Sequence, residues 1–330
     1  MCKYMSNKYN PILANFPLLE SLFRNLYWRI KPVYTVINYL LEKKSKLIHN
    51  PVSFYKPKDI SYQFLNSIHS NIFSCDDSIL VHSSLQRLKE VGVDASIFAN
   101  ELISSQSRKG NICLPTFPLF RNEPKRFNRF DDIPLDPNLF KFDLSSTRVS
   151  TGLLGKTILD YKNHKRSKIP INNLSALGSC SENLFNKEIN YHLSPYPCGK
   201  YSAWQEIYKL NFTIVFLDVN PTHTCTLIHN IEDSNPELWP VSNWYRSREY
   251  SIRDKESCFV LKTLQRKPKW SLSYCENILF RDLIQNNIVQ SHNVCGINIY
   301  IMKASEFINY VKNHRKENYP YYLTCLSRTC

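Results

Sequence analysis

The sequence has little glycine, no long apolar run and comparatively few acidic residues. Only seven of its 330 residues are glycine, so turns must rely on proline, asparagine and serine. No apolar run approaches the ~18 to 20 residues that a membrane-spanning helix needs. The N-terminus lacks the apolar core of a signal peptide, because Tyr4, Lys8 and Asn10 interrupt it. We therefore expect a cytoplasmic protein.

The cysteines show no closely spaced pair. There are eleven, spread along the chain, and no two have the C-x-x-C spacing. That spacing is typical of zinc sites and redox-active disulfides. We therefore expect reduced cysteines and no metal site.

Positive charge is in excess. Lysine and arginine number 42 against 28 acidic residues, which gives a formal net charge of +14. Such a surplus favours anionic partners, namely nucleic acid, a phospholipid surface or phosphorylated small molecules. The alternative is that the charge serves only to solvate the surface.

Helical and strand patterns alternate from residue 59 onward. The apolar runs Ser78–Val81 and Asn111–Pro115 have strand length, and residues 60–72 and 96–102 have helical periodicity. This order predicts an α/β fold in which helices flank a layered, mixed sheet. We predict a main domain at residues 59–312 and a C-terminal tail at 313–330.

Residues 1–58 have a different pattern, in which aromatic and basic residues alternate between prolines. The segment from Leu18 to Leu41 predicts two amphipathic helices separated near Pro32. We therefore predict an N-terminal helical arm. It can pack on the main domain, meet a partner, or contact a membrane surface peripherally.

The segment after the apolar run 213–219 holds the strongest candidates for chemistry. If the residues after Thr224 form a helix, His229 and Glu232 lie three positions apart and share one face. An imidazole beside a carboxylate at the carboxyl end of a strand is a common proton acceptor. The alternative is that the pair is only a polar helix face.

Two further segments are candidates for binding an anion. His82, Ser83 and Ser84 follow the first buried strand, where the serines can cap a helix whose amides face a phosphate. Capping without a ligand is the alternative. Arg166 and Ser167 lie in a basic cluster, 162–168, which can bind phosphate or complement a helix C-terminus.

These segments, in this order, resemble the aminoglycoside 3-N-acetyltransferase family, whose acyl-CoA-dependent members acylate an amino group on a sugar ring. The resemblance covers roughly residues 59–312. It rests on Val81–Leu85, Gly110–Phe117, Thr147–Arg148 with Gly152–Gly155, Arg166–Pro170 with Ala176–Gly178, Ser202–Leu210 and Thr226–Glu232.

The resemblance implies a role for each candidate residue and requires no metal. His229 would be the catalytic base and Glu232 would orient it. Acetyl-CoA or another acyl-CoA would be the co-substrate, bordered by His82, Ser83, Ser84 and Leu85, with its phosphates contacting Arg166 and Ser167. Backbone amides near Ser83 and Ser84 would stabilise the oxyanion.

The sequence departs from the family pattern at three places. Ile169 replaces a histidine and Asp218 replaces a glycine. Arg121 or Asn122, the candidate substrate-binding residues, replace an acidic residue. Because aminoglycosides are polycations, this change and the net charge favour an anionic acceptor.

We therefore hypothesise that the acceptor is a nucleotide-linked amino sugar used in surface-polysaccharide synthesis. One alternative is an aminoglycoside acceptor, which would confer antibiotic resistance. Another is a family member that has lost catalysis and acts as a basic binding protein. Nucleic acid is not the expected partner.

Overall fold

The computed structural model describes residues 10–48, 64, 66–68, 70, 78–120, 140–239, 241–314 and 321. The strands are Ile79–Ser83 (β1), Asn111–Pro115 (β2), Lys141–Asp143 (β3), Lys165–Arg166 (β4), Leu174–Gly178 (β5), Thr213–Leu217 (β6), Tyr245–Asp254 (β7), Ser257–Arg266 (β8), Gln290–Val294 (β9) and Ile297–Lys303 (β10). The α-helices include Pro11–Asn15 (α1), Pro17–Arg29 (α2), Lys31–Ile48 (α3), Ala95–Lys109 (α5), Gly152–Thr157 (α6), Ala203–Lys209 (α7), Pro221–Thr224 (α8), Ile228–Ser234 (α9), Glu276–Gln285 (α10) and Ala304–Asn313 (α11). The 3-10 helices include Leu88–Val91 (η2), Ile158–Asp160 (η5), Asn186–Leu193 (η6), Pro236–Leu238 (η7) and Pro268–Ser273 (η8).

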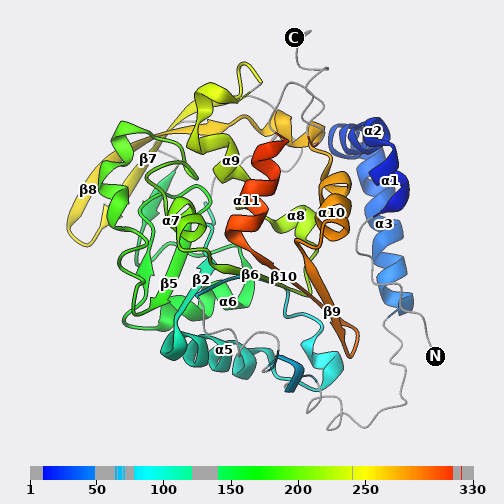
Figure 1. Cartoon of the computed structure of the whole chain (residues 1–330), viewed down its shortest axis with the longest axis horizontal. Coiled ribbons are helices and arrows are strands. Elements are labelled where there is room, and N and C mark those ends of the chain that lie inside the picture. Colours follow the sequence, from blue (N-terminus) through cyan, green and yellow to red (C-terminus); the bar gives the residue numbers. More distant parts are fainter. Residues whose placement is uncertain are drawn as a thin grey trace.

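The main sheet of the described residues has seven strands in the order β4-β5-β2-β1-β6-β10-β9. β1 pairs in parallel with β2 and β6, whereas the other neighbours are antiparallel. A second sheet, β3-β7-β8, extends toward the left of Figure 1. The predicted α/β fold with a mixed sheet is confirmed.

Helices cover both faces of the main sheet (Figure 1). Alternate residues of a strand face opposite sides, so Ile79 and Val81 join one hydrophobic core while Leu80 joins the other. The first core contains residues of α5 and α6. The second contains residues of α7, α9, α10 and α11. The sheet is therefore the middle layer of three.

The parallel arrangement brings the carboxyl ends of β1, β2 and β6 to one edge of the sheet, where α/β proteins commonly bind ligands. α6 approaches this edge closely. A Cβ atom at Gly155 would lie 2.7 Å from the carbonyl oxygen of Pro115, the last residue of β2. Glycine is therefore required at this position.

The N-terminal arm consists of α1, α2 and α3, and it packs beside α10 (Figure 1). The break between its two longer helices falls at Ile30, close to the predicted position. The backbone N–H of Asn10 donates to Asn277 Oδ1 over 2.8 Å, and the Ser21 hydroxyl donates to the Leu272 carbonyl over 3.1 Å. The predicted boundaries at residues 58 and 312 stay predictions. No helix in the described ranges has the length and apolarity to cross a bilayer.

Candidate active site

A cleft of about 680 Å³ lies at the carboxyl edge of the parallel strands, within the usual range for small-molecule sites. Its walls come from the ends of β1 and β2, from α6, and from the chain after β6. Its lining includes Val81–Gln86, Leu114, Pro115, Phe117, Ser150–Gly155, Val219, His223, Thr224 and Thr226.

His82 lines the cleft as a buried, neutral imidazole. Its ring stacks on Phe216 with 5.1 Å between the ring centroids, and burial lowers its pKa to about 3. Its buried Nε2 has no hydrogen-bond partner among the described residues. Leaving such an atom unpaired costs about 1–3 kcal/mol.

Ser83, Ser84 and Leu85 also line the cleft, but the predicted helix cap at the serines is wrong. The chain turns after β1 and forms only the short helix η2; α5 begins at Ala95. Its cap is Asp94, whose Oδ1 accepts from the Ser96 amide over 2.8 Å. The Ser84 amide donates to the Leu217 carbonyl over 2.9 Å. That amide is therefore unavailable to an oxyanion, and the serines offer their hydroxyls instead.

Arg166 is buried, and its guanidinium binds protein groups. It donates four hydrogen bonds, to Asn173 Oδ1 and to the carbonyl oxygens of Leu144, Thr147 and Thr116. Burial lowers its pKa to about 10. Because most of its donors are occupied, this conformation does not favour the predicted phosphate contact, which stays a prediction.

Ser167 is also engaged. Its hydroxyl donates to Glu188 Oε1 over 2.6 Å and accepts from the Ile169 amide over 3.0 Å. Burial raises the pKa of Glu188 to about 7, although the Ser167 hydrogen bond opposes the rise. Ile169, where the family pattern has a histidine, is itself buried. This segment forms part of the packed interior, and the predicted phosphate contact of Ser167 stays a prediction.

His229 and Glu232 share one face of α9, as the spacing predicts. His229 Nδ1 lies 3.0 Å from Glu232 Oε2, and their side chains are 19% and 1% exposed. A nitrogen facing a carboxylate oxygen carries the proton, so Nε2 of a neutral ring keeps its lone pair. Glu232 Oε1 lies 3.8 Å from Arg266 Nη1. Thr226, one turn before His229, lines the cleft, whereas His229 is outside the described lining. Its catalytic role stays a prediction.

Asp233 places a second carboxyl group behind this pair. Its Oδ2 accepts from the Cys198 amide over 2.9 Å, and its Oδ1 lies 2.9 Å from the Tyr245 hydroxyl. Burial, followed by the charge of Glu232, raises the pKa of Asp233 to about 8. This carboxyl is therefore mainly protonated at neutral pH.

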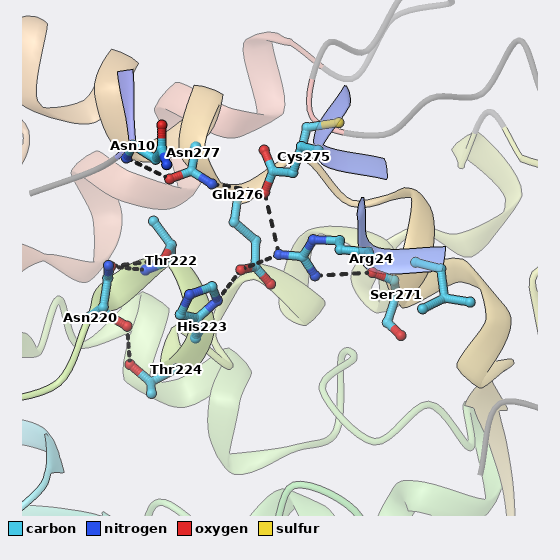
Figure 2. A network of polar contacts seen from close by, with 12 residues as sticks. Asn10, Arg24, Asn220, Thr222, His223, Thr224, Ser271, Cys275, Glu276 and Asn277 are labelled. Atoms are coloured by element: carbon cyan, nitrogen blue, oxygen red, sulfur yellow. Dashed lines mark hydrogen bonds and ion pairs between the residues drawn. The ribbon is translucent and has the colours of Figure 1, made fainter. Parts of the chain in front are cut away.

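His223 was not predicted from the sequence, and it lines the cleft on α8. Its Nδ1 contacts Glu276 Oε2 at the start of α10 (Figure 2). One signal was available. Asn220-Pro221 is a typical helix start, and the Asn220 side chain indeed caps α8. That pattern places His223 beyond the end of β6, but it does not reveal the distant carboxylate.

The other departures have different outcomes. Arg121 and Asn122 lie outside the described residues. Asp218 has φ +51°, in the left-handed region that glycine favours, and its carboxylate lies 3.1 Å from Arg87 Nη1. The backbone conformation at this position thus suits the glycine of the family pattern.

A family model described as aminoglycoside 3-N-acetyltransferase matches residues 80–315. The chain belongs to the aminoglycoside 3-N-acetyltransferase family. This places it among the acyl-CoA-dependent N-acyltransferases, as the resemblance implied. No curated protein matches the chain in sequence.

Solved aminoglycoside acetyltransferases share the fold. The apoenzyme of AAC(3)-IVa is 17% identical, with a TM-score of 0.55 over 83% of this chain and 97% of that one. AAC-IIIb with coenzyme A is 14% identical, with a TM-score of 0.52 over 79% and 96%. A mutant of AAC(3)-IVa with gentamicin is 16% identical, with a TM-score of 0.52 over 78% and 87%. At these identities the likeness concerns the fold alone.

Proposed function

We propose that this protein transfers an acetyl group from acetyl-CoA to an amino group of an aminoglycoside-type amino sugar. The His229–Glu232 pair carries the proposal. An amine must lose protons during acylation, and a neutral imidazole is well suited to accept one near neutral pH. This pair stands one turn after cleft-lining Thr226.

The cleft at the end of β1 suits the co-substrate. When bound, acetyl-CoA supplies a thioester carbonyl that the amine nitrogen attacks, with the thiol as the leaving group. His82 would border the pantetheine chain. Ser83, Ser84 and Leu85 would border the same chain.

The proposed proton transfer uses His229 as the base and Glu232 as the group that orients it. Glu232 accepts a hydrogen bond from the Nδ1–H group of His229, which fixes the ring and leaves Nε2 as the base. Arg266, 3.8 Å from the other oxygen of Glu232, favours the ionised carboxylate. The carboxylate in turn stabilises the imidazolium that forms when Nε2 takes the proton from the amine.

The solved relatives favour an aminoglycoside over the nucleotide-linked amino sugar that the net charge suggested. One relative holds gentamicin and another holds sisomicin. Two observations keep the nucleotide-linked sugar as a second candidate. The net charge is +14, and the described lining of the cleft contains no carboxylate.

The test is acetyl transfer measured by thiol release from acetyl-CoA. Gentamicin, a kanamycin-type amine and a nucleotide-linked amino sugar would be compared at equal concentration, with the His229→Ala variant as control. Higher kcat/KM for the aminoglycosides supports the proposal. Higher kcat/KM for the nucleotide-linked sugar contradicts it and favours the second candidate.

Binding without transfer would have a different meaning. If acetyl-CoA raises the melting temperature but none of the amines is acetylated, the protein is a family member that has lost catalysis. Salt-sensitive retention on DNA would then identify it as a basic binding protein.

A further inference from the structure

The cleft contains a second imidazole–carboxylate pair that the proposed reaction does not use. His223 lines the cleft, and its Nδ1 contacts Glu276 Oε2 (Figure 2). The His223 side chain is 62% exposed, whereas that of Glu276 is 11% exposed. The imidazole therefore faces open space while its carboxylate is largely buried.

This contact determines what His223 can offer. The tautomer with the proton on Nδ1 interacts favourably with this carboxylate oxygen. Nε2 of the neutral ring then keeps its lone pair and can accept a hydrogen bond. Hydroxyl and amino groups are the donors that an amino sugar presents.

Glu276 is held in place from the N-terminal arm. Arg24 on α2 places Nη2 2.5 Å from Glu276 Oε2, the same oxygen that His223 contacts. The Arg24 side chain is 19% exposed. Its guanidinium also donates to the Ser271 carbonyl over 3.4 Å and to Glu20 Oε1 over 3.4 Å. These contacts fix the guanidinium, and through it the carboxylate.

The arm is itself anchored at this point. Asn277, next to Glu276, donates from Nδ2 to Glu20 Oε1 over 3.0 Å and accepts from the Asn10 amide over 2.8 Å. Arg24 lies outside the region that the family model matches, 80–315. The arginine that holds Glu276 beside His223 therefore comes from a segment outside the matched region.

We propose that His223 is an acceptor-binding residue, positioned by Glu276 and Arg24, whose Nε2 accepts a hydrogen bond from a hydroxyl or amino group of the amino sugar. The N-terminal arm thereby becomes part of the acceptor site. This inference rests on the proposed acetyl transfer and adds a contact for the acceptor.

The test compares His223→Ala and Arg24→Met with Arg281→Met as the matched control. Arg281 holds the same arm, donating to the Ala14 carbonyl over 2.9 Å and to Asn15 Oδ1 over 3.2 Å. Its ion pair is with Asp282. For each variant, kcat, the KM of the acceptor and the affinity for acetyl-CoA by calorimetry would be measured.

We expect His223→Ala to raise the acceptor KM roughly 3- to 10-fold, the range for losing one hydrogen bond. Loss of binding that is equal in the ground state and transition state leaves kcat nearly unchanged. Arg24→Met should raise the KM by a similar or smaller factor. The double variant should resemble His223→Ala alone, because Arg24 acts through His223. Affinity for acetyl-CoA should not change, and Arg281→Met should retain the wild-type KM.

Three results with the variants would overturn the inference alone. An unchanged acceptor KM in His223→Ala would show that His223 does not contact the acceptor. A KM raised equally by Arg24→Met and Arg281→Met shows that arm docking in general, and not this ion pair, matters. A drop in kcat of more than roughly 100-fold in His223→Ala would show that His223 is a general base. If Arg24→Met does not fold, Glu276→Gln removes the charge while keeping the side-chain size. No transfer by the wild-type chain overturns the proposed function and this inference together.

Discussion

The two imidazole–carboxylate pairs are built in different ways. His229 and Glu232 belong to one turn of α9, and both side chains are largely shielded. His223 and Glu276 come from α8 and α10, with Arg24 added from the N-terminal arm (Figure 2). The first pair is a local product of helix geometry and the second is assembled by the fold. A shielded imidazole suits proton transfer, whereas an exposed one suits contact with a substrate.

The distance from each carboxylate to the nearby arginine differs as well. Arg24 lies 2.5 Å from Glu276, but Arg266 lies 3.8 Å from Glu232. Coulomb attraction weakens with distance, so Arg24 neutralises more of the charge of Glu276. Glu232 retains more of its charge for stabilising a protonated His229. This difference is consistent with the proposed base on α9 and the proposed binding contact on α8.

The largest expected effect comes from removing the base. His229→Ala should lower kcat by roughly 100-fold or more, because a positioned general base contributes about that much. Acetyl-CoA affinity should change little, since His229 is outside the described lining of the cleft. Steady-state kinetics with calorimetry measures both. Equal losses of kcat in His229→Ala and His223→Ala would erase the distinction between the pairs.

A smaller effect should follow from neutralising each carboxylate. Glu232→Gln keeps an oxygen that can face His229 Nδ1 but loses the negative charge. We expect kcat to fall about 10-fold, since a charge-assisted hydrogen bond is worth roughly 1.4 kcal/mol more than a neutral one. Glu276→Gln is the matched variant and should change the acceptor KM but not kcat. A larger loss of kcat in Glu276→Gln than in Glu232→Gln would reverse the assignment.

The same contrast explains what the sequence can predict. The α9 pair follows from helical spacing, and β1 and β2 follow from short apolar runs. These features depend on neighbouring residues. The His223 pair needs three segments that are distant in the chain, so no local pattern contains it.

The predictions at the ends of β1 and β4 were limited by long-range contacts. Serines after a strand are typical helix caps, but the Ser84 amide is taken by Leu217 on β6, and the cap of α5 is Asp94. A basic cluster is typical of phosphate binding, but Arg166 is buried and donates to backbone carbonyls. The sequence shows the type of side chain but does not show which partner it finds.

The smallest expected effect concerns Asp233, which follows Glu232 on α9. The effect is on stability. Arg24 contacts both Glu20 and Glu276. Asp233 is held by the Cys198 amide and the Tyr245 hydroxyl, and the charge of Arg266 opposes only part of the rise in its pKa. Its pKa, raised by burial from 3.8 to about 8, makes folding take up a proton between these values. Its contribution to stability is therefore fully present below about pH 3.8 and is lost as the pH rises through about 8.

Asp233→Asn should remove this pH dependence, because the amide does not titrate. Its Oδ1 can still accept from Cys198 and its Nδ2 can donate to Tyr245. Between pH 6 and pH 8 the wild type should lose up to about 1.4 kcal/mol of unfolding free energy per pH unit more than the variant, the value for one proton. Denaturant unfolding at several pH values measures this slope.

Asp143→Asn is the matched control for that slope. Hydrogen bonds from Ser145 and Ser146 lower the pKa of Asp143 to about 2, so its contribution is lost only as the pH falls below its unfolded value. It should shift the stability equally at pH 6 and pH 8. If Asp233→Asn and Asp143→Asn give the same slope as the wild type, Asp233 is ionised in the folded protein. Two adjacent negative charges, those of Glu232 and Asp233, would then lie on α9.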